Sequence, residues 1–268
     1  MVAPGDGAVC SSVNIKANRN TALIGGEARM SESRTRIPHQ HVPRLDCRWE
    51  LALDGLRPDE RVLICRILSR KQFGARSRIY TAGDPADSLL IVESGRMRWF
   101  YSNEAGEEFT LGIWPQGYTT GLISLLLDKP RPVSVETVEP TVILALRRAD
   151  LLRFMETMPT FAINIARLAA SIAGYSMDTT SPLALQSASV RLCQALENLA
   201  IVEDDGEKPV IKGLKQEDLA SLVGVSRTWI TLMLSDLERR GFIWRRRQHI
   251  GLLNVEGLRR YCAAAGIR

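Results

Sequence analysis

The residues best suited to chemistry lie near the C-terminus, where the sequence SRTWIT is followed by three successive arginines. Arg227, Thr228 and Thr231 are predicted to face outward near the start of a helix whose apolar residues point the other way. A helix in the DNA major groove reads base edges mainly with its N-terminal residues, and arginine offers a fork that matches guanine O6 and N7. Arg245–Arg247 follow in a predicted hairpin, where they would meet phosphates. This pattern favours binding to double-stranded DNA.

The distribution of charge points to the same end of the chain. Residues 213–268 hold 10 Lys/Arg and 5 Asp/Glu. The whole chain has 35 Lys/Arg and 30 Asp/Glu, so the remaining residues carry 25 of each sign and are neutral overall. Clustered cations gain free energy by displacing counterions from a polyanion, which favours nucleic acid first and a membrane surface second. A solvated charged face is the alternative that charge alone leaves open.

Two amphipathic helices are predicted to position the candidate side chains. They are separated by residues 223–226, where Gly224 can adopt the turn conformation and Ser226 can cap the second helix. Their shared core is predicted to consist of Leu219, Leu222, Val223, Ile230, Met233, Leu234 and Leu237. Residues 242–247 and 250–254 predict a two-stranded hairpin around a turn at 248–249. Helical bundles without DNA also join helices through glycine, but spacing, exposed arginine, basic hairpin and charge excess together favour DNA.

The upstream part of the chain predicts a sensor built from short strands. Residues 1–45 lack lasting periodicity and are predicted to be a mobile leader. Residues 54–68 predict one helix, whose apolar face carries Val62, Leu63, Ile67 and Leu68. Brief β-branched or aromatic runs follow at 77–83, 87–95, 96–103, 107–114 and 133–146. Their spacing is typical of an antiparallel sandwich or barrel, expected over about 74–148.

A long helix is predicted to connect the two parts, starting at Thr160 after a short helix that ends at Pro159. Its apolar stripe, with steps of three and four, consists of Phe161, Ile165, Leu168, Ile172 and Tyr175. Such a seam can pair with a copy of itself, so we predict a dimer interface; packing on the chain's own barrel is the alternative. Pro182 lacks an amide hydrogen, which predicts a hinge at 178–182 and a further helix over 183–202.

Several classes of function find no support in the sequence. Cysteines at 10, 47, 65, 193 and 262 form no CxxC pair and predict scattered reduced thiols without a metal site. The three histidines, at 39, 41 and 249, lie outside the barrel, and no motif of an enzyme occurs. No stretch approaches the roughly 20 apolar residues of a membrane span, and the N-terminus lacks a secretory signal. We therefore expect a soluble, cytoplasmic protein that is not an enzyme.

The order of these elements resembles the cyclic-AMP receptor and fumarate-nitrate regulator (CRP/FNR) family over about residues 46–262. The stretches GDPADSLLIVESGRMRWF, LKQEDLASLVGVSRTWI and LERRGFI carry the resemblance. It implies an α+β fold with a β-roll sensor of the cyclic-nucleotide-binding, jelly-roll type over 46–158, a dimerisation helix and hinge over 159–181, and a winged helix-turn-helix over 182–268. It also implies a homodimeric transcription regulator that binds double-stranded DNA, with RNA polymerase as a further candidate partner. A ligand-binding or scaffold protein whose winged helix contacts another protein is the alternative.

The expected DNA contacts combine the residues inferred from the helix and hairpin with Ser226 and Arg227, for which the resemblance implies base or phosphate contact. These are Gln216, Ser226, Arg227, Thr228, Trp229, Thr231, Arg245, Arg246 and Arg247. The family's usual Ser-Arg-Glu-Thr start is here Ser-Arg-Thr-Trp, so the glutamate that reads cytosine is absent, and Leu232 replaces a frequent basic residue. The operator is therefore expected to depart from the family's common sequence, and Trp229 either packs inward or touches a thymine methyl.

The expected effector pocket departs further from the family pattern. It consists of Trp114, Gly117, Tyr118, Thr119, Thr120, Gly121, Leu122, Arg131, Pro132, Val133, Ser176 and Met177. Leu122 cannot accept a ribose hydroxyl hydrogen, Pro132 removes a hydroxyl and a backbone donor, and Met177 removes one hydroxyl expected to contact the base. Tight binding of cyclic AMP is thus not expected, and no cofactor is identified. Three alternatives remain open: a different small molecule, a pocket filled by side chains, or a signal from a protein or a modification.

Overall fold

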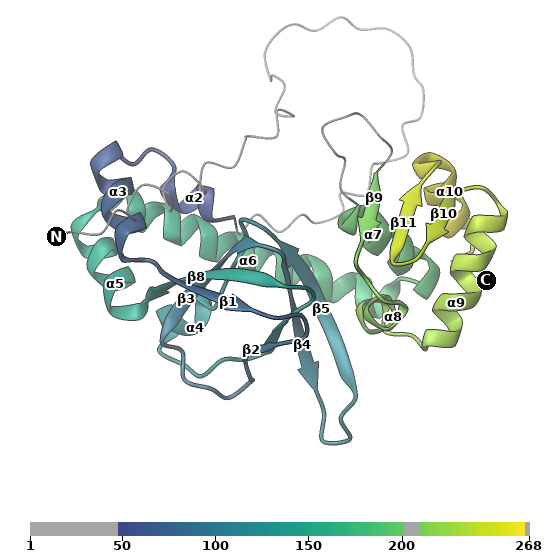
Figure 1. The fold of residues 1–268 in the computed structure, drawn as a ribbon, viewed down its shortest axis with the longest axis horizontal. Helices are drawn as coiled ribbons and strands as arrows, with labels where there is room; N and C mark the ends of the chain where they lie inside the picture. The colour runs from purple at the N-terminus through teal and green to yellow at the C-terminus, as the bar shows by residue number, and fades with distance from the viewer. Residues whose placement is uncertain (1–47, 201–208, 266–268) are drawn as a thin grey trace, which may run out of the picture.

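The chain folds into a strand-rich part and a helix-rich part joined by one long helix (Figure 1). The structure is a computed structural model that describes residues 48–200 and 209–265. The predicted leader, residues 1–45, lies outside the described residues. The mixed α+β class predicted from the sequence is confirmed, with a β-roll before the long helix and a winged helix-turn-helix after it.

Two antiparallel four-stranded sheets make up the sensor domain. Their strand orders are β1-β8-β3-β6 and β2-β7-β4-β5. The strands are β1 (Ser69–Phe73), β2 (Arg78–Tyr80), β3 (Ser88–Ser94), β4 (Arg96–Ser102), β5 (Glu108–Pro115), β6 (Thr119–Thr120), β7 (Ser134–Thr137) and β8 (Thr141–Arg147). The helices of this part are α2 (Trp49–Leu53), α3 (Pro58–Ile67), α4 (Leu122–Leu127) and α5 (Arg148–Thr157). A core that includes Met97, Leu125, Val135 and Leu146 fills the space between these elements.

Some local predictions for the sensor need correction. Strand β1 was not predicted because its sequence, SRKQF, is polar and four of its five residues are exposed, so it shows no alternation. Helix α3 forms, but Val62 and Leu63 are exposed while Ile64 and Cys65 are buried. The run VLICRIL is apolar almost throughout, and its periodicity therefore does not select the buried face.

The long helix α6 (Pro159–Leu185) packs on its own barrel. Phe161, Ile165 and Leu168 are each 0 % exposed, and Ile172 and Tyr175 pack against the same core. The predicted dimer seam is therefore wrong for the fully buried residues, because the alternative packing within the chain already covers them.

The opposite side of α6 is exposed over residues 163–173. Its exposed residues include Ile163, Ala166, Ala170 and Ala173, which recur at steps of three and four, and Arg167 beside them. This periodicity places them on one face of the helix. A narrow stripe of mainly small side chains is thus the face of α6 that the chain itself leaves uncovered.

The predicted hinge also needs correction, because α6 continues through Pro182 and ends at Leu185. A proline inside a helix removes the one hydrogen bond that its own nitrogen would donate, while the bonds on either side can persist. The chain leaves helical structure at Gln186 and Ser187 instead, and the Ser187 side chain accepts a bond from the Val190 amide. The next helix, α7 (Ala188–Leu199), consequently starts five residues later than predicted at 183.

The C-terminal part is a winged helix-turn-helix built on α7. It consists of β9 (Val210–Lys212), α8 (Gln216–Val223), α9 (Arg227–Arg239), β10 (Ile243–Arg246), β11 (His249–Leu252) and α10 (Val255–Ala265). The two predicted helices and the hairpin are confirmed, and β9 adds a third strand in the order β10-β11-β9. The hairpin turns one residue earlier than predicted, with Gln248 at a φ of 57°.

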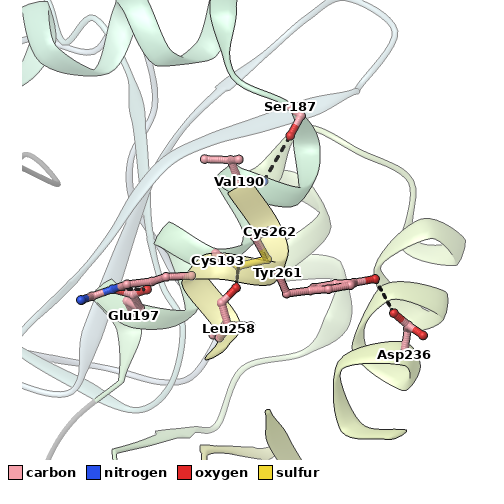
Figure 2. Close-up of a disulfide and its surroundings, with 9 residues drawn as sticks. Ser187, Val190, Cys193, Glu197, Asp236, Leu258, Tyr261 and Cys262 are labelled. Atoms are coloured by element: carbon pink, nitrogen blue, oxygen red, sulfur yellow. Dashed lines mark hydrogen bonds and ion pairs between the residues drawn. A yellow bond between two sulfur atoms is a disulfide. The ribbon is translucent and has the colours of Figure 1, made fainter. Parts of the chain in front are cut away.

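A disulfide links Cys193 of α7 to Cys262 of α10 (Figure 2). The prediction of reduced thiols is wrong for this pair. The two cysteines are 69 residues apart in the sequence, and only the packing of α10 on α7 brings them together.

The packing of α6 is tested by two truncations two residues apart in the sequence, which lie on opposite faces of the helix. Phe161→Ala removes a ring that contacts Trp49 and Phe154, with ring centroids 6.3 and 6.1 Å away, and should lower the free energy of unfolding by about 3–5 kcal/mol. Ile163→Ala, at a side chain 56 % exposed, should change it by no more than about 0.5 kcal/mol in dilute protein. Urea unfolding measures both, and equal losses would contradict this packing.

Candidate DNA interface and effector pocket

The turn between α8 and α9 fixes the angle between the two helices. Gly224 ends α8 in the left-handed conformation, with a φ of 71°, and its amide donates to the Ala220 carbonyl at 2.9 Å. Glycine adopts this conformation without a Cβ penalty. Ser226 then caps α9, because its hydroxyl accepts the Trp229 amide at 3.2 Å. Both roles predicted from the sequence are confirmed.

The predicted apolar core holds the two helices together. Leu219 and Val223 of α8 are 1 % exposed, and Ile230, Leu234 and Leu237 of α9 are fully buried. Leu222 and Met233 are only partly buried at the margin of this core. The face of α9 opposite to the core is thereby directed to solvent.

This outer face of α9 carries the residues that the sequence predicted for base contact. Ser226, Arg227, Thr228 and Thr231 are all exposed. The Thr231 hydroxyl lies 2.6 Å from the Gln216 side-chain oxygen, so the first residue of α8 belongs to the same surface. Arg227 forms a 3.2 Å ion pair with Glu217, but its side chain is 69 % exposed. Exposed pairs of this kind contribute little, so the guanidinium can exchange this partner for DNA.

Two apolar residues of α9 differ in their role. Trp229 is partly buried and packs on the domain core, which resolves the two alternatives for this residue in favour of inward packing. Leu232 is 67 % exposed on the outer face. A leucine at this position can contact a thymine methyl, a role that the sequence analysis did not assign to it.

The three arginines of the wing are not equivalent. Arg245 donates to Glu238 through Nε at 2.9 Å and Nη2 at 2.7 Å, and to Ser235 at 3.1 Å, so it fastens the wing to α9. The pKa of Glu238 is lowered mainly by this hydrogen bond from Arg245. Arg246 and Arg247 are exposed and extend from the hairpin. The structure therefore offers these two, more than Arg245, to a phosphate backbone.

The sensor domain contacts the helix-turn-helix through an ion pair between a partly exposed arginine and a buried carboxylate. Arg76, between β1 and β2, donates to both carboxylate oxygens of Asp218 at 2.6 and 2.7 Å. Asp218 is 3 % exposed and also caps α8 by accepting the Lys215 amide at 2.9 Å. The pKa of Arg76 is raised, mainly by its hydrogen bond to Asp218. One carboxylate thus joins the sensor to the first helix of the reading unit.

Strand β5 adds a second set of contacts to α8. The Thr110 amide donates to the Ser221 hydroxyl at 3.0 Å, and that hydroxyl donates to the Glu108 carbonyl at 3.1 Å. Ile113 and Val138 of the sensor are buried in the same apolar cluster as the helix-turn-helix core. Figure 1 shows β5 and α8 side by side at this joint, whose contacts extend to the turn at Gly224.

In the expected effector pocket, Arg131 is hydrogen-bonded to backbone carbonyls of its own chain. Its guanidinium is 3 % exposed and donates to the Ser88 carbonyl at 2.6 Å and to the Gly121 carbonyl at 3.4 Å. It also lies over the Tyr80 ring, 4.5 Å from the centroid. A Cβ at Gly121 would lie 1.9 Å from Arg131 Nη1, so only glycine permits this approach.

The other pocket residues are mostly buried among aromatic rings. Trp114 stacks on Tyr118 and meets Tyr175 of α6 edge-on, each at 5.4 Å between ring centroids. The buried members of the set are Trp114, Gly117, Thr119, Thr120, Leu122, Arg131 and Val133, whereas Pro132 is exposed. The side chains of Ser176 and Met177 lie outside the described residues. The structure brings the described members together but directs most of them into the domain interior.

Other site chemistries find no support in the described parts of the chain. Over residues 48–200 and 209–265, no group of three or more His, Cys, Asp or Glu side chains is arranged to hold a metal ion. Helices within the same ranges are too short or too polar to cross a bilayer.

Comparison with known proteins gives the family. Residues 70–158 match the family model of the cyclic nucleotide-binding domain, and residues 190–261 match that of the Crp-like helix-turn-helix domain. The chain is 31 % identical over 189 residues to the cyclic AMP receptor protein of Thermus thermophilus, an alignment that covers 70 % of this chain and 86 % of that protein.

Solved structures share the fold. FixK2 from Bradyrhizobium japonicum superposes with a TM-score of 0.63 at 18 % identity, covering 72 % of this chain and 96 % of that one. A CRP/FNR-family transcriptional regulator from Thermus thermophilus superposes with a TM-score of 0.58 at 25 % identity, covering 74 % of this chain and 100 % of that one. Transcription regulators rather than enzymes make up this family. The chain belongs to the CRP/FNR family and is a transcription regulator with a Crp-like helix-turn-helix DNA-binding domain.

Proposed function

We propose that this regulator binds a palindromic operator as a homodimer and reads each half-site with α9. The observation that carries the proposal is the exposed N-terminal surface of α9, where Arg227, Thr228 and Thr231 face outward from a buried core. These residue types at a helix N-terminus match direct readout in the major groove. Arg246 and Arg247 of the wing would contact the flanking phosphates.

The exposed stripe on α6 supports the homodimer. Ala166, Ala170 and Ala173 lie on one uncovered face together with Ile163, which is 56 % exposed. Small side chains let two helix backbones approach closely, and two copies of this face would place two α9 helices about a two-fold axis. The two half-sites would then lie about 34 Å apart, one turn of DNA.

The sequence of each half-site follows from the side chains on α9. Arg227 would pair with guanine through O6 and N7, and Leu232 would contact a thymine methyl. No glutamate is present at this helix start to accept from a cytosine amine. The operator should therefore differ from the sequence that the family commonly reads.

The sensor pocket is proposed not to use cyclic AMP in the usual way. Arg131, the residue that would hold the phosphate, is already bonded to two carbonyls and covered by Tyr80. Leu122 is 1 % exposed and offers no acceptor for a ribose. Side chains that fill the pocket, or an effector of different chemistry among Trp114 and Tyr118, fit these observations better.

A signal in the sensor has a short physical route to the reading helix. Val133, in the pocket segment, immediately precedes β7, and β7 carries Glu136. The Glu136 carboxylate lies 3.7 Å from Arg76 Nη1, and Arg76 holds Asp218 of α8. These two ion pairs would transmit a change in the pocket to α8 and, through it, to α9. We also propose RNA polymerase as a further binding partner, because a transcription regulator acts where the polymerase binds DNA.

Selection of bound sequences from random double-stranded DNA with the purified protein tests the function directly. We expect a palindrome with half-sites one helical turn apart, because two α9 helices related by two-fold symmetry read the same bases. Enrichment of no sequence would contradict the proposal and favour a protein partner for the winged helix. A single unpaired half-site would contradict the homodimer.

Arg227→Ala separates base readout from phosphate contact. This variant should cost about 1–3 kcal/mol on the selected operator and little on unrelated DNA, whereas Arg247→Ala should weaken both and lower the salt dependence by roughly one phosphate contact. Fluorescence anisotropy over a salt series measures the two effects. Loss of equal size on every sequence for Arg227→Ala would count against base readout.

Calorimetric titration with cyclic AMP and cyclic GMP tests the pocket. We expect no heat of binding at micromolar ligand, because Leu122 offers no acceptor for a ribose hydroxyl and Arg131 Nη1 and Nη2 already donate to the Gly121 and Ser88 carbonyls. Micromolar affinity for either nucleotide would overturn the proposal for the pocket and leave the DNA function intact.

A further inference from the structure

The disulfide between Cys193 and Cys262 joins the first and last helices of the DNA-binding domain (Figure 2). Both cysteines are almost fully buried, at 4 and 1 % exposure. Their Cα atoms lie 6.5 Å apart, a separation that a disulfide spans. In the reduced state two buried thiols would pack as small apolar side chains in the same cluster. The site can therefore hold either redox state.

Helix α10 connects this disulfide to the reading helix. On one side, Arg259 donates to both carboxylate oxygens of Glu197 in α7, with the shortest distance 2.7 Å. On the other side, the Tyr261 hydroxyl donates to the Asp236 carboxylate in α9 at 2.5 Å. Tyr261 directly precedes Cys262 in the chain. A change in how Cys262 is held thus acts on the residue that contacts α9.

Asp236 is the point where α10 meets the charges of α9. Its carboxylate also accepts from Arg240 at 2.7 Å and from Arg239. These bonds, that of Tyr261 first, lower the pKa of Asp236 to about 2. The Arg240 guanidinium in turn lies over the Tyr261 ring, 4.5 Å from its centroid. The C-terminal turn of α9 is therefore anchored to α10 through one shared carboxylate.

The position of α10 makes it the element most sensitive to loss of the disulfide. It has 11 residues and follows the wing as the last helix of the described chain. Helices open locally at a cost set by the contacts that hold them in place. The disulfide closes a loop of 69 residues, which restricts such opening. Because both sulfurs are buried, exchange with an outside thiol requires this same opening.

We propose that Cys193 and Cys262 form a redox couple that sets the affinity of this regulator for DNA, with the disulfide state binding more tightly. The inference rests on the proposed function. DNA lies in compartments where thiols are kept reduced, and disulfides found there are typically redox-sensing rather than permanent. The disulfide state keeps α10, and through Tyr261 the end of α9, in the arrangement that presents Arg227.

The chemistry is thiol–disulfide exchange with a dithiol reductant or two monothiols. A thiolate of the reductant attacks one sulfur of the disulfide, which breaks the bond and releases the other sulfur as a thiolate. A second reductant thiolate then attacks the reductant sulfur of the mixed disulfide. The bond to the protein sulfur breaks, that sulfur leaves as a thiolate, and the reductant is released as its disulfide. Two electrons and two protons pass to Cys193 and Cys262, and the reverse reaction with a low-molecular-weight disulfide restores the bond.

Full-length protein equilibrated in glutathione buffers of graded redox ratio tests the couple. Cys10→Ser and Cys47→Ser are present in every sample, so that those cysteines contribute no thiols. Maleimide trapping with mass spectrometry follows the pair, and anisotropy on the selected operator follows binding. Reduction should weaken DNA affinity about tenfold or more and lower the melting temperature of the winged-helix domain by on the order of 10 °C.

Three variants separate the couple from general damage. Cys193→Ala with Cys262→Ala should bind DNA as the reduced protein does in every buffer. Cys65→Ala, which changes a buried cysteine of α3, should leave the redox dependence unchanged. Tyr261→Phe should still form the disulfide but lose most of the redox effect on DNA affinity, because the bond to Asp236 is gone.

Several results would overturn the proposal. Two free thiols at these positions in every buffer, or equal DNA affinity in both states after complete conversion, would contradict it. An undiminished redox effect in Tyr261→Phe would contradict the route through Asp236. If neither state binds any selected DNA, the proposed function fails and control of DNA binding falls with it. The trapping and melting measurements would still show whether the couple exists.

Discussion

The bidentate ion pair between Arg76 and Asp218 is the constraint on which the arrangement of the two domains depends. The Asp218 carboxylate performs two tasks, because it accepts both guanidinium bonds from the sensor and caps α8 through the Lys215 amide. Asp218 is almost fully buried, so removing Arg76 would leave a charge that water reaches poorly. The sensor therefore cannot shift relative to α8 without disturbing the start of that helix.

Further contacts connect this ion pair to the sensor on one side and to the DNA-binding domain on the other. Toward the sensor, Glu136 of β7 also receives a 2.7 Å bond from Arg98 of the neighbouring strand β4, so the ion-pair chain continues across this sheet. Toward the DNA-binding domain, the cap fixes α8, the turn at Gly224 fixes α9, and the buried face of α9 directs Arg227 to solvent. Helix α10 completes the unit at the far end through Tyr261 and the disulfide.

The sequence predicted those features that depend on local patterns. The helix-turn-helix followed from Gly224, Ser226 and the apolar spacing, because caps and turn residues act within a few positions. Strands β2–β5, β7 and β8 of the sensor followed in the same way from short β-branched or aromatic runs. The outward position of Arg227 needed only the periodicity of one helix, and the structure confirms it.

The features that were missed depend on contacts distant in the sequence. The stripe of α6 fits a dimer seam and a barrel-facing side equally well, and only the folded barrel shows that Phe161 is covered within the chain. The Cys193–Cys262 pair has no spacing signal across 69 residues. The sequence predicted the same phosphate contact for Arg245 as for Arg246 and Arg247, whereas in the structure Arg245 donates to Glu238 of α9. Pro182 marked a hinge by its local chemistry, but the helix tolerates one lost bond.

A double-mutant cycle across the domain joint tests the central claim most directly. Arg76→Ala, Asp218→Asn and the double variant are compared by urea unfolding of the winged-helix domain within the full chain, with Asn retaining an oxygen for the Lys215 amide. A joint that holds the domains predicts a coupling energy of about 1–3 kcal/mol between the two sites. The pair of Arg260 and Glu256, with both side chains more than two thirds exposed, is the control, with less than about 1 kcal/mol expected. Additive losses at Arg76 and Asp218 would contradict the claim that this ion pair joins the sensor to the reading helices.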